Sequence, residues 1–270
     1  TTVRVINKGK GKADKEYLWM VRAVQEKWVI FHYDDGSRSG KTIKRLLKGF
    51  KGYLQSDGYS AYNVFEGTEG VCLIACLAHI RRHFEQALEE NRSLAENALK
   101  TIQDLYRIEH LADSQEYIPK ERCELRRHQS TPLLDSFEKW MESSYVKVPP
   151  RSRLGQAISY AYPLWPRMRA YLNDGCIKID NNLAENAIRP LTLSRKNFLF
   201  CGNHEAAENT AIICSLLATC KAQEINPREW LNDVIAQLPH YLAKGSGKNV
   251  RNLLPDVWKL EKSNEKPIEV

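Results

Sequence analysis

A continuous apolar run, VCLIACLA at residues 71–78, limits the fold more than any other feature of this chain. Its length suits a strand, and it lacks the alternation of apolar and polar residues that marks a strand facing water on one side. Such a run is expected of a strand that is buried on both faces, and sheets with strands of this kind are covered by helices. The run therefore predicts a protein of the α/β class.

The segments around this run predict further strands and helices. Residues 2–6, 16–24 and 27–33 are rich in Val, Ile, Tyr, Trp and Phe and are joined by short links, which predicts an antiparallel meander. The predicted elements that follow are a basic helix at 39–48, a strand at 52–56, the run at 71–78 and a helix at 79–88. Three antiparallel strands followed by strand–helix units in a mixed sheet give the element order of the ribonuclease H-like fold.

Long amphipathic helices replace this pattern in the middle of the chain, where apolar residues keep a mixed three and four spacing. After them we expect a short extended stretch, a helix at 182–189 that stops at Pro190, an extended basic segment at 191–200, and two helices at 205–221 and 227–238. The predicted domains are the first part of the core at 1–92, an all-helical insertion at 93–173, the second part of the core at 174–240, and a loosely held tail at 241–270.

Positive charge is concentrated near the N-terminus. The chain has a formal net charge of +7, and residues 1–55 hold thirteen Lys and Arg against five acidic residues. A basic face of this kind suits a polyanion, of which nucleic acid is the commonest. A solubilising surface is the alternative that charge alone leaves open.

Cysteine usage and hydropathy favour a reducing cytoplasm. The seven cysteines are odd in number and irregularly spaced, which disfavours a disulfide framework. The longest strongly apolar stretch, at 210–220, is too short to span a bilayer, so we expect no membrane association. The first residues have no apolar core of a signal peptide and no initiator Met, and we expect the chain to start inside a longer protein.

Two carboxylates are candidates for catalysis, and each has a structural alternative. Asp57 follows a predicted strand, at the edge where a sheet presents side chains to a ligand, but Asp-Gly is also a turn dipeptide. Glu185 lies one turn before Arg189, which keeps a carboxylate ionised for metal binding. Alternatively, Asn182 and Glu185 form a capping box, or Asp180 caps the helix.

Basic and metal-binding side chains form two further candidate groups. Arg195 and Lys196 precede aromatic residues, which fits phosphate contacts and base stacking, although a solvated basic strand edge explains them equally. Cys76, His79 and His83 form the one Cys/His cluster; it lacks an obvious fourth zinc ligand, so a buried polar hinge between strand and helix is the favoured interpretation. Arg81 and Arg82 beside this cluster are candidates for phosphate contacts.

Four motifs in this order resemble the catalytic region of insertion-sequence 66 family transposases. They read YLQSDGYSAYN, CLAHIRRHFEQAL, IDNNLAENAIRPLTLSRKNFLFCG and SLLATCKAQEINPREWLNDVIAQLP. The resemblance runs from Thr1 to about residue 239, and RPLTLSRKNFLF is its most diagnostic part. It implies a DDE-type transposase with a ribonuclease H-like fold, in which an Asp, Asp, Glu triad binds two divalent ions, Mg²⁺ or Mn²⁺.

The resemblance also assigns roles to particular residues. Asp57 matches the second Asp of the triad, and Glu185 matches the Glu of the DNNxxE pattern. Cys76 and His79 match a structural Cys-x-x-His motif, whereas His83 stands where members more often carry Lys or Arg. The family's first Asp lies in an Asp-Glu-Thr segment that this chain lacks, so we expect a fragment that is inactive or nearly so by itself.

The resemblance implies metal-dependent DNA cleavage and strand transfer, without a protein nucleophile, by a bacterial cytoplasmic enzyme associated with the nucleoid. Its expected partners are double-stranded transposon ends and target DNA, and a second copy of the chain in a dimer or larger assembly on DNA. Arg81, Arg82, Arg189, Arg195 and Lys196 are the expected DNA contacts. Two alternatives are a non-catalytic DNA-binding remnant and a ribonuclease H-like nuclease that cuts without joining.

Overall fold

The computed structural model of the chain describes residues 1–6 and 12–265. Lys8 and Lys10, which contribute to the basic N-terminal segment, lie outside the described residues. The chain divides into two compact units, one of residues 1–42 and 183–270 and the other of residues 43–182. We call them the sheet unit and the helical unit. No helix in the described part of the chain is long and apolar enough to cross a membrane.

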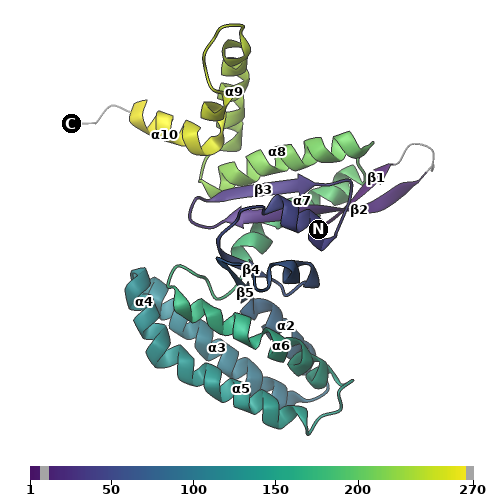
Figure 1. Cartoon of the computed structure of the whole chain (residues 1–270), viewed down its shortest axis with the longest axis vertical. Helices are drawn as coiled ribbons and strands as arrows, with labels where there is room; N and C mark the ends of the chain where they lie inside the picture. The colour runs from purple at the N-terminus through teal and green to yellow at the C-terminus, as the bar shows by residue number, and fades with distance from the viewer. Residues whose placement is uncertain (7–11, 266–270) are drawn as a thin grey trace. The chain divides into compact units, whose positions relative to one another are not determined.

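The sheet unit is built on an antiparallel sheet in the order β1-β2-β3 (Figure 1). Val3 and Val5 of β1, with Val29 and Phe31 of β3, form one buried face, because side chains alternate between the two sides of a strand. Its elements are β1 (Thr2–Ile6), β2 (Ala13–Ala23), β3 (Trp28–Tyr33), α7 (Asn182–Phe198), α8 (His204–Ala222), α9 (Pro227–Leu242), a 3-10 turn (Val250–Leu253) and α10 (Pro255–Glu265).

Helix α8 lies beside β3 and closes the outer edge of that strand (Figure 1). The hydroxyl of Thr219 accepts from the N–H of Val29 at 3.1 Å and donates to its carbonyl at 3.0 Å. The hydroxyl of Ser215, one turn earlier, accepts from the N–H of Phe31 at 2.8 Å. Its one hydrogen has two acceptors, the carbonyl of Ala211 at 2.7 Å and that of Phe31 at 3.3 Å. These side chains therefore hydrogen-bond backbone groups that an edge strand otherwise leaves to solvent.

The helical unit combines a two-stranded parallel sheet, β4-β5, with a bundle of helices. Its elements are β4 (Gly52–Ser56), a 3-10 turn (Ser60–Phe65), β5 (Val71–Ala75), α2 (Leu77–Gln86), α3 (Arg92–Ser114), α4 (Pro119–Leu125), a π-helical turn (Arg126–Ser130), α5 (Thr131–Tyr145), α6 (Arg153–Arg169) and a 3-10 turn (Ala170–Asn173). Helix α1 (Gly40–Leu46) crosses the boundary between the units.

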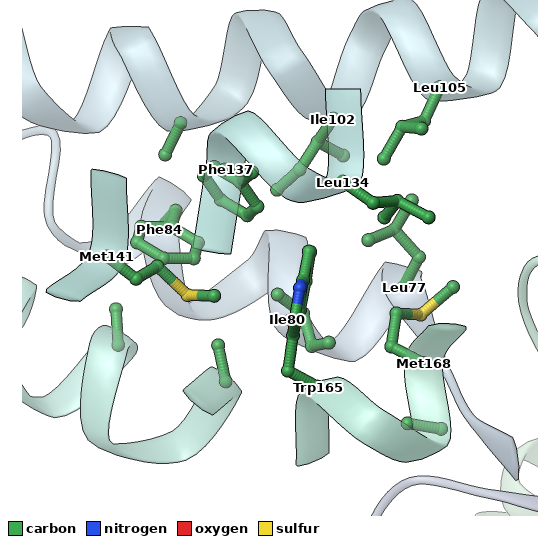
Figure 2. Close-up of a cluster of buried hydrophobic side chains, with 14 of the residues drawn as sticks. Leu77, Ile80, Phe84, Ile102, Leu105, Leu134, Phe137, Met141, Trp165 and Met168 are labelled. Atoms are coloured by element: carbon green, nitrogen blue, oxygen red, sulfur yellow. The ribbon is translucent and has the colours of Figure 1, made fainter. Parts of the chain in front are cut away.

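One apolar core joins these helices to β5. Figure 2 shows Phe84 of α2, Phe137 of α5 and Trp165 of α6 turned toward the same interior. Phe137 packs edge-on against Trp165 with ring centroids 5.1 Å apart, and it lies 5.7 Å from Phe84. Because Ile74 belongs to the same cluster, the helices and β5 form a single packed body. The predicted division at 92/93 and 173/174 stays a prediction; the compact units divide elsewhere.

A buried arginine cross-links this unit. Arg126, which is fully buried, donates to both carboxylate oxygens of Glu109 at 2.8 and 2.7 Å. Its other N–H groups donate to the carbonyls of Tyr171, Asp174 and Ile177 at 2.7–2.8 Å. All five guanidinium donors are thereby used, which is the condition under which a buried charge is tolerated.

Several expectations about elements were wrong. Residues 191–200 are not extended: α7 continues through Pro190 to Phe198. Its later turns pack on the sheet through the buried Leu191, and Arg195 donates to the carbonyl of Thr2 at 2.7 Å. These tertiary contacts offset the cost of a proline inside a helix, about 3 kcal/mol.

The predicted tail is also partly helical. Helix α10 packs on α8 and α9 through Trp258, whose indole N–H donates to Asp233 at 2.6 Å. The strand predicted at 71–78 ends at Ala75, because α2 begins at Leu77.

The α/β class is confirmed, but the described strands form two separate sheets rather than one mixed sheet. The edge of β1 opposite β2 is occupied by Cys201, which forms a parallel bridge with Val5. The N–H of Cys201 donates to the backbone carbonyl of Arg4 at 2.7 Å, and the carbonyl of Cys201 accepts from the N–H of Ile6 at 2.9 Å.

Replacing the buried arginine should destabilise the chain strongly. We expect Arg126→Met to lower the free energy of unfolding by about 3–5 kcal/mol, because three carbonyls and part of the Glu109 carboxylate lose their buried donors. The matched control is Arg169→Met, which removes a more exposed pair with Asp135 and should cost under about 1 kcal/mol. Urea denaturation measures the free energy of unfolding of both variants. Equal losses in the two would contradict the structural role given to Arg126.

Candidate active site

Asp57 follows β4 directly and lies at the carboxyl edge of the parallel β4-β5 pair. In this pair Ser56 is opposite Ala75, so the next residues, Asp57 and Cys76, both leave the sheet at the same edge. The carboxylate of Asp57 is exposed, and its Oδ1 accepts from the N–H of Tyr59 at 3.0 Å. Asp57 is therefore a turn residue and an exposed carboxylate at a strand end, so the two interpretations are compatible.

The turn after Asp57 is held by helix α6. Gly58 adopts a φ of +80°, and a Cβ at this position would lie 2.7 Å from a methyl carbon of Leu164. The hydroxyl of Tyr160 donates to the carbonyl of Asp57 at 2.5 Å. Burial, together with the charge of Asp57, raises the pKa of Tyr160 to about 12, so the phenol stays a donor at neutral pH. Helix α6 therefore fixes the backbone that carries Asp57.

His83 of α2 packs against the same tyrosine. The two rings are stacked, with centroids 4.0 Å apart and planes inclined by 29°. Burial lowers the pKa of His83, and the neighbouring His79 and Arg82 lower it further. The neutral imidazole is thus the form that the folded chain favours.

Cys76 anchors the segment that leads to Glu185. The thiol is buried, and its sulfur accepts from the N–H of Asn181 at 3.4 Å. The N–H of Leu77 donates to the carbonyl of Ile179 at 3.1 Å, so the first residues of α2 hold two positions of this segment. Burial raises the pKa of Cys76, which keeps it a thiol. The contact of Cys76 with Asn181 supports the interpretation of the Cys76 and His79 motif as a hinge between strand and helix.

Glu185 lies in the first turn of α7, and its side chain is exposed. Asn182 is the first helical residue rather than the N-cap, and its N–H donates to Oδ1 of Asp180 at 3.0 Å. Asp180 therefore caps the helix, as the second capping interpretation had it. In the sheet unit Arg22 donates to the carbonyl of Leu183 at 3.0 Å and holds the same turn.

The basic candidates differ in what they contact. Arg82, Arg189 and Lys196 are exposed. Arg81 forms an ion pair with Glu85 at 2.5 Å, and Arg195 donates to Thr1 and Thr2 of the sheet unit. DNA contact by any of the five stays a prediction.

The two candidate carboxylates belong to different units, Asp57 to the helical unit and Glu185 to the sheet unit. Among the residues that the structure describes, no group of three or more His, Cys, Asp and Glu side chains is arranged to hold a metal ion. Metal binding by Asp57 and Glu185 stays a prediction.

Sequence analysis missed the tyrosines that support the site. Tyr160 and Tyr106 lie on long amphipathic helices, where an aromatic residue is expected to pack in the core. No local sequence pattern indicates that the hydroxyl of such a residue binds a distant loop. The one available signal was that each tyrosine lies beside the apolar stripe of its helix rather than within it.

Comparison with known proteins finds the same family along nearly the whole chain. The family model described as Transposase IS66 family matches residues 1–209, and the model described as IS66 C-terminal element matches residues 215–255. The chain is similar to the uncharacterized proteins y4qI and y4jD of Sinorhizobium fredii, with 32% identity over 88% of this chain and 30% over 83%. It spans 46% and 45% of the lengths of these relatives. No solved structure matches.

Acidification should weaken the fold through His83. Because the pKa of His83 is lowered from its ordinary value of 6.5, its contribution to stability is complete above that value and is lost as the pH falls through the folded pKa. Between about pH 7.5 and about pH 5.5, the free energy of unfolding measured in urea should fall less in His83→Gln than in the parent chain. A control variant, His110→Gln, alters an exposed histidine. If both variants changed the pH dependence of the free energy of unfolding equally, His83 would not be the cause of the acid destabilisation.

Proposed function

Because the chain belongs to the IS66 family of transposases, we propose that it forms the catalytic region of a DDE-type transposase that cleaves and joins DNA with divalent metal ions. The observation that carries this proposal is the placement of Asp57, an exposed carboxylate at the carboxyl edge of a parallel strand pair. Glu185 adds an exposed carboxylate in the first turn of a capped helix, within the DNNxxE pattern.

The element order supports a ribonuclease H-like fold as the framework of this proposal. An antiparallel β1-β2-β3 sheet precedes a parallel β4-β5 pair, and a helix follows β5 directly. We propose that the two sheets are the two parts of such a fold.

The donor chemistry of Asp57 and Glu185 fits Mg²⁺ or Mn²⁺, because these ions prefer carboxylate oxygens and keep several waters, which exposed side chains permit. When bound, two such ions would activate the attacking oxygen and stabilise the leaving 3′ oxygen of the phosphodiester. Tyr160 would hold the backbone of Asp57 in place, and the Asp180 cap would order the turn that carries Glu185. The chemistry requires no protein nucleophile.

We propose transposon ends and target DNA as substrates, a dimer or larger assembly on DNA, and the bacterial cytoplasm, at the nucleoid, as the place of action. Arg82, Arg189 and Lys196 would contribute most to phosphate binding, because they are exposed. Arg81 and Arg195 would contribute less, since Glu85 and the first two residues of the chain compete for their guanidinium groups.

Removing either carboxylate should abolish metal-dependent cleavage of DNA that carries the element's ends, measured in a longer protein that includes this chain and the first Asp of the triad. Since even partners outside the ligand shell of a metal change activity about 10–100-fold, we expect losses of at least about 100-fold in Asp57→Asn and Glu185→Gln. Asp35→Asn and Glu205→Gln are matched controls: Asp35 also precedes a glycine in a turn, and Glu205 also lies in the first turn of a helix. Gel assays in Mg²⁺ and in Mn²⁺ measure the rates.

The same assays separate the alternatives. Joined products support a transposase, whereas cleavage without joining favours a nuclease. DNA binding without turnover in either metal favours a non-catalytic remnant. Full activity in both carboxylate variants would refute the assigned site.

Removing basic side chains should weaken DNA binding in proportion to the number of phosphate contacts that are lost. We expect Arg189→Ala and Lys196→Ala each to lower affinity for DNA of any sequence and to reduce the slope of log K against log salt by about 1. Lys139→Ala, a charge change on α5, is the control. Fluorescence anisotropy over a range of salt concentrations measures both quantities; an unchanged slope in both variants would remove these residues from the DNA-binding surface.

A further inference from the structure

The carboxylate of Asp180 has hydrogen-bond partners at both oxygens. Its Oδ1 accepts from the N–H of Asn182 at 3.0 Å, which caps α7. Its Oδ2 accepts from the hydroxyl of Tyr106 at 2.9 Å and from the side-chain amide of Asn182 at 2.8 Å. Burial and the charge of Asp180 both raise the pKa of Tyr106, so its phenol remains a donor. The cap is thus itself oriented by a side chain from another helix.

Tyr106 is fixed in turn by the long helix α3. Its neighbours Ile102 and Leu105 are fully buried in the core of the helical unit, which sets the rotation of the helix about its axis. Tyr106 lies three residues before Glu109, so the two side chains project from neighbouring positions on one side of α3. Glu109 binds Arg126, and Arg126 holds the carbonyls of Tyr171, Asp174 and Ile177.

One side of α3 therefore controls both ends of the segment that leads into α7. Glu109 acts through Arg126 on residues 171–177, and Tyr106 acts on Asp180. Between them, Gln55 of β4 donates to the carbonyl of Lys178 at 2.9 Å. The segment up to Asn182 is therefore held by contacts from within the helical unit.

We propose that Tyr106 and Asp180 are a positioning pair that fixes the first turn of α7 and, through it, the carboxylate of Glu185. In this proposal the pair acts through Glu185 and has no contact of its own with DNA or metal. The consequence for catalysis rests on the proposed function of Glu185, whereas the effect on the helix does not.

Hydrogen exchange in the first turn of α7 tests the pair directly. We expect the amide of Asn182 and the amides of residues 186–189, whose acceptors lie in or before the first turn, to exchange about fivefold faster in Asp180→Ala, the factor that corresponds to a lost cap of about 1 kcal/mol, and about twofold faster in Tyr106→Phe. Asp180→Asn keeps an acceptor for the N–H of Asn182 and should restore slow exchange. Tyr162→Phe removes a comparable phenol–carboxylate bond, with Glu142 at 2.8 Å, and should leave α7 unchanged.

Two results of this exchange experiment would overturn the proposal. One is unchanged exchange of the amides of residue 182 and residues 186–189 in both Asp180→Ala and Tyr106→Phe. The other is uniform acceleration throughout the helical unit, which would show that the residues serve general stability.

Cleavage assays with the same variants test the link to Glu185. The Mn²⁺ concentration for half-maximal cleavage should rise several-fold in Asp180→Ala and Tyr106→Phe, with a smaller change in rate at saturating Mn²⁺, because the ligand is present but less ordered. If α7 loosens while a parent protein that also carries the first Asp of the triad cleaves no DNA, the proposed function fails and the positioning pair stands. If α7 loosens and the Mn²⁺ requirement of an active parent is unchanged, the link to Glu185 is refuted.

Discussion

The buried ion pair between Arg126 and Glu109 is the interaction on which the helical unit depends most. A guanidinium removed from water is costly unless every donor finds an acceptor, and here a carboxylate and three carbonyls supply them. Those carbonyls belong to the chain between α6 and α7, which has little regular structure of its own. The side chains of Tyr171, Ile177 and Ile179 join the hydrophobic core, and the buried charge supplies the hydrogen-bond partners that the backbone of this segment needs.

The organisation of the candidate site follows from that path. Residues 178–182 run past the ends of β4 and β5 and are held by Gln55, Cys76, Leu77 and Tyr106. The backbone carbonyl of Asp57 accepts a hydrogen bond from the hydroxyl of Tyr160. Two side chains of the helices between β5 and α7, those of Tyr106 and Tyr160, therefore hold groups that lie near the proposed ligands in the sequence.

The parts of this structure that were predictable from sequence are those determined by local pattern. The strand at residues 2–6 was found because Val and Ile cluster there, and the strand at 52–56 because it ends at the turn dipeptide Asp57-Gly58. The cap by Asp180 was one of two stated alternatives. The continuation of α7 through Pro190 was not predictable, because contacts of Leu191 and Arg195 with the distant β1 outweigh the local signal. The hydroxyls of Tyr106 and Tyr160 act across 74 and 103 residues, and single-sequence patterns carry no information at that range.

The hydroxyls of Ser215 and Thr219 also limit what this protein can associate with. They occupy the N–H groups of Val29 and Phe31 and the carbonyl of Val29, which an added strand from another polypeptide would need. Recognition by β-augmentation is therefore closed along this side of the sheet, and so is the stacking of copies into cross-β aggregates from this strand. Helix α8, with its two hydroxyl residues one turn apart, thus covers the edge of β3 that an added strand would otherwise occupy. This protection against aggregation matters because β3 is rich in aromatic and β-branched residues.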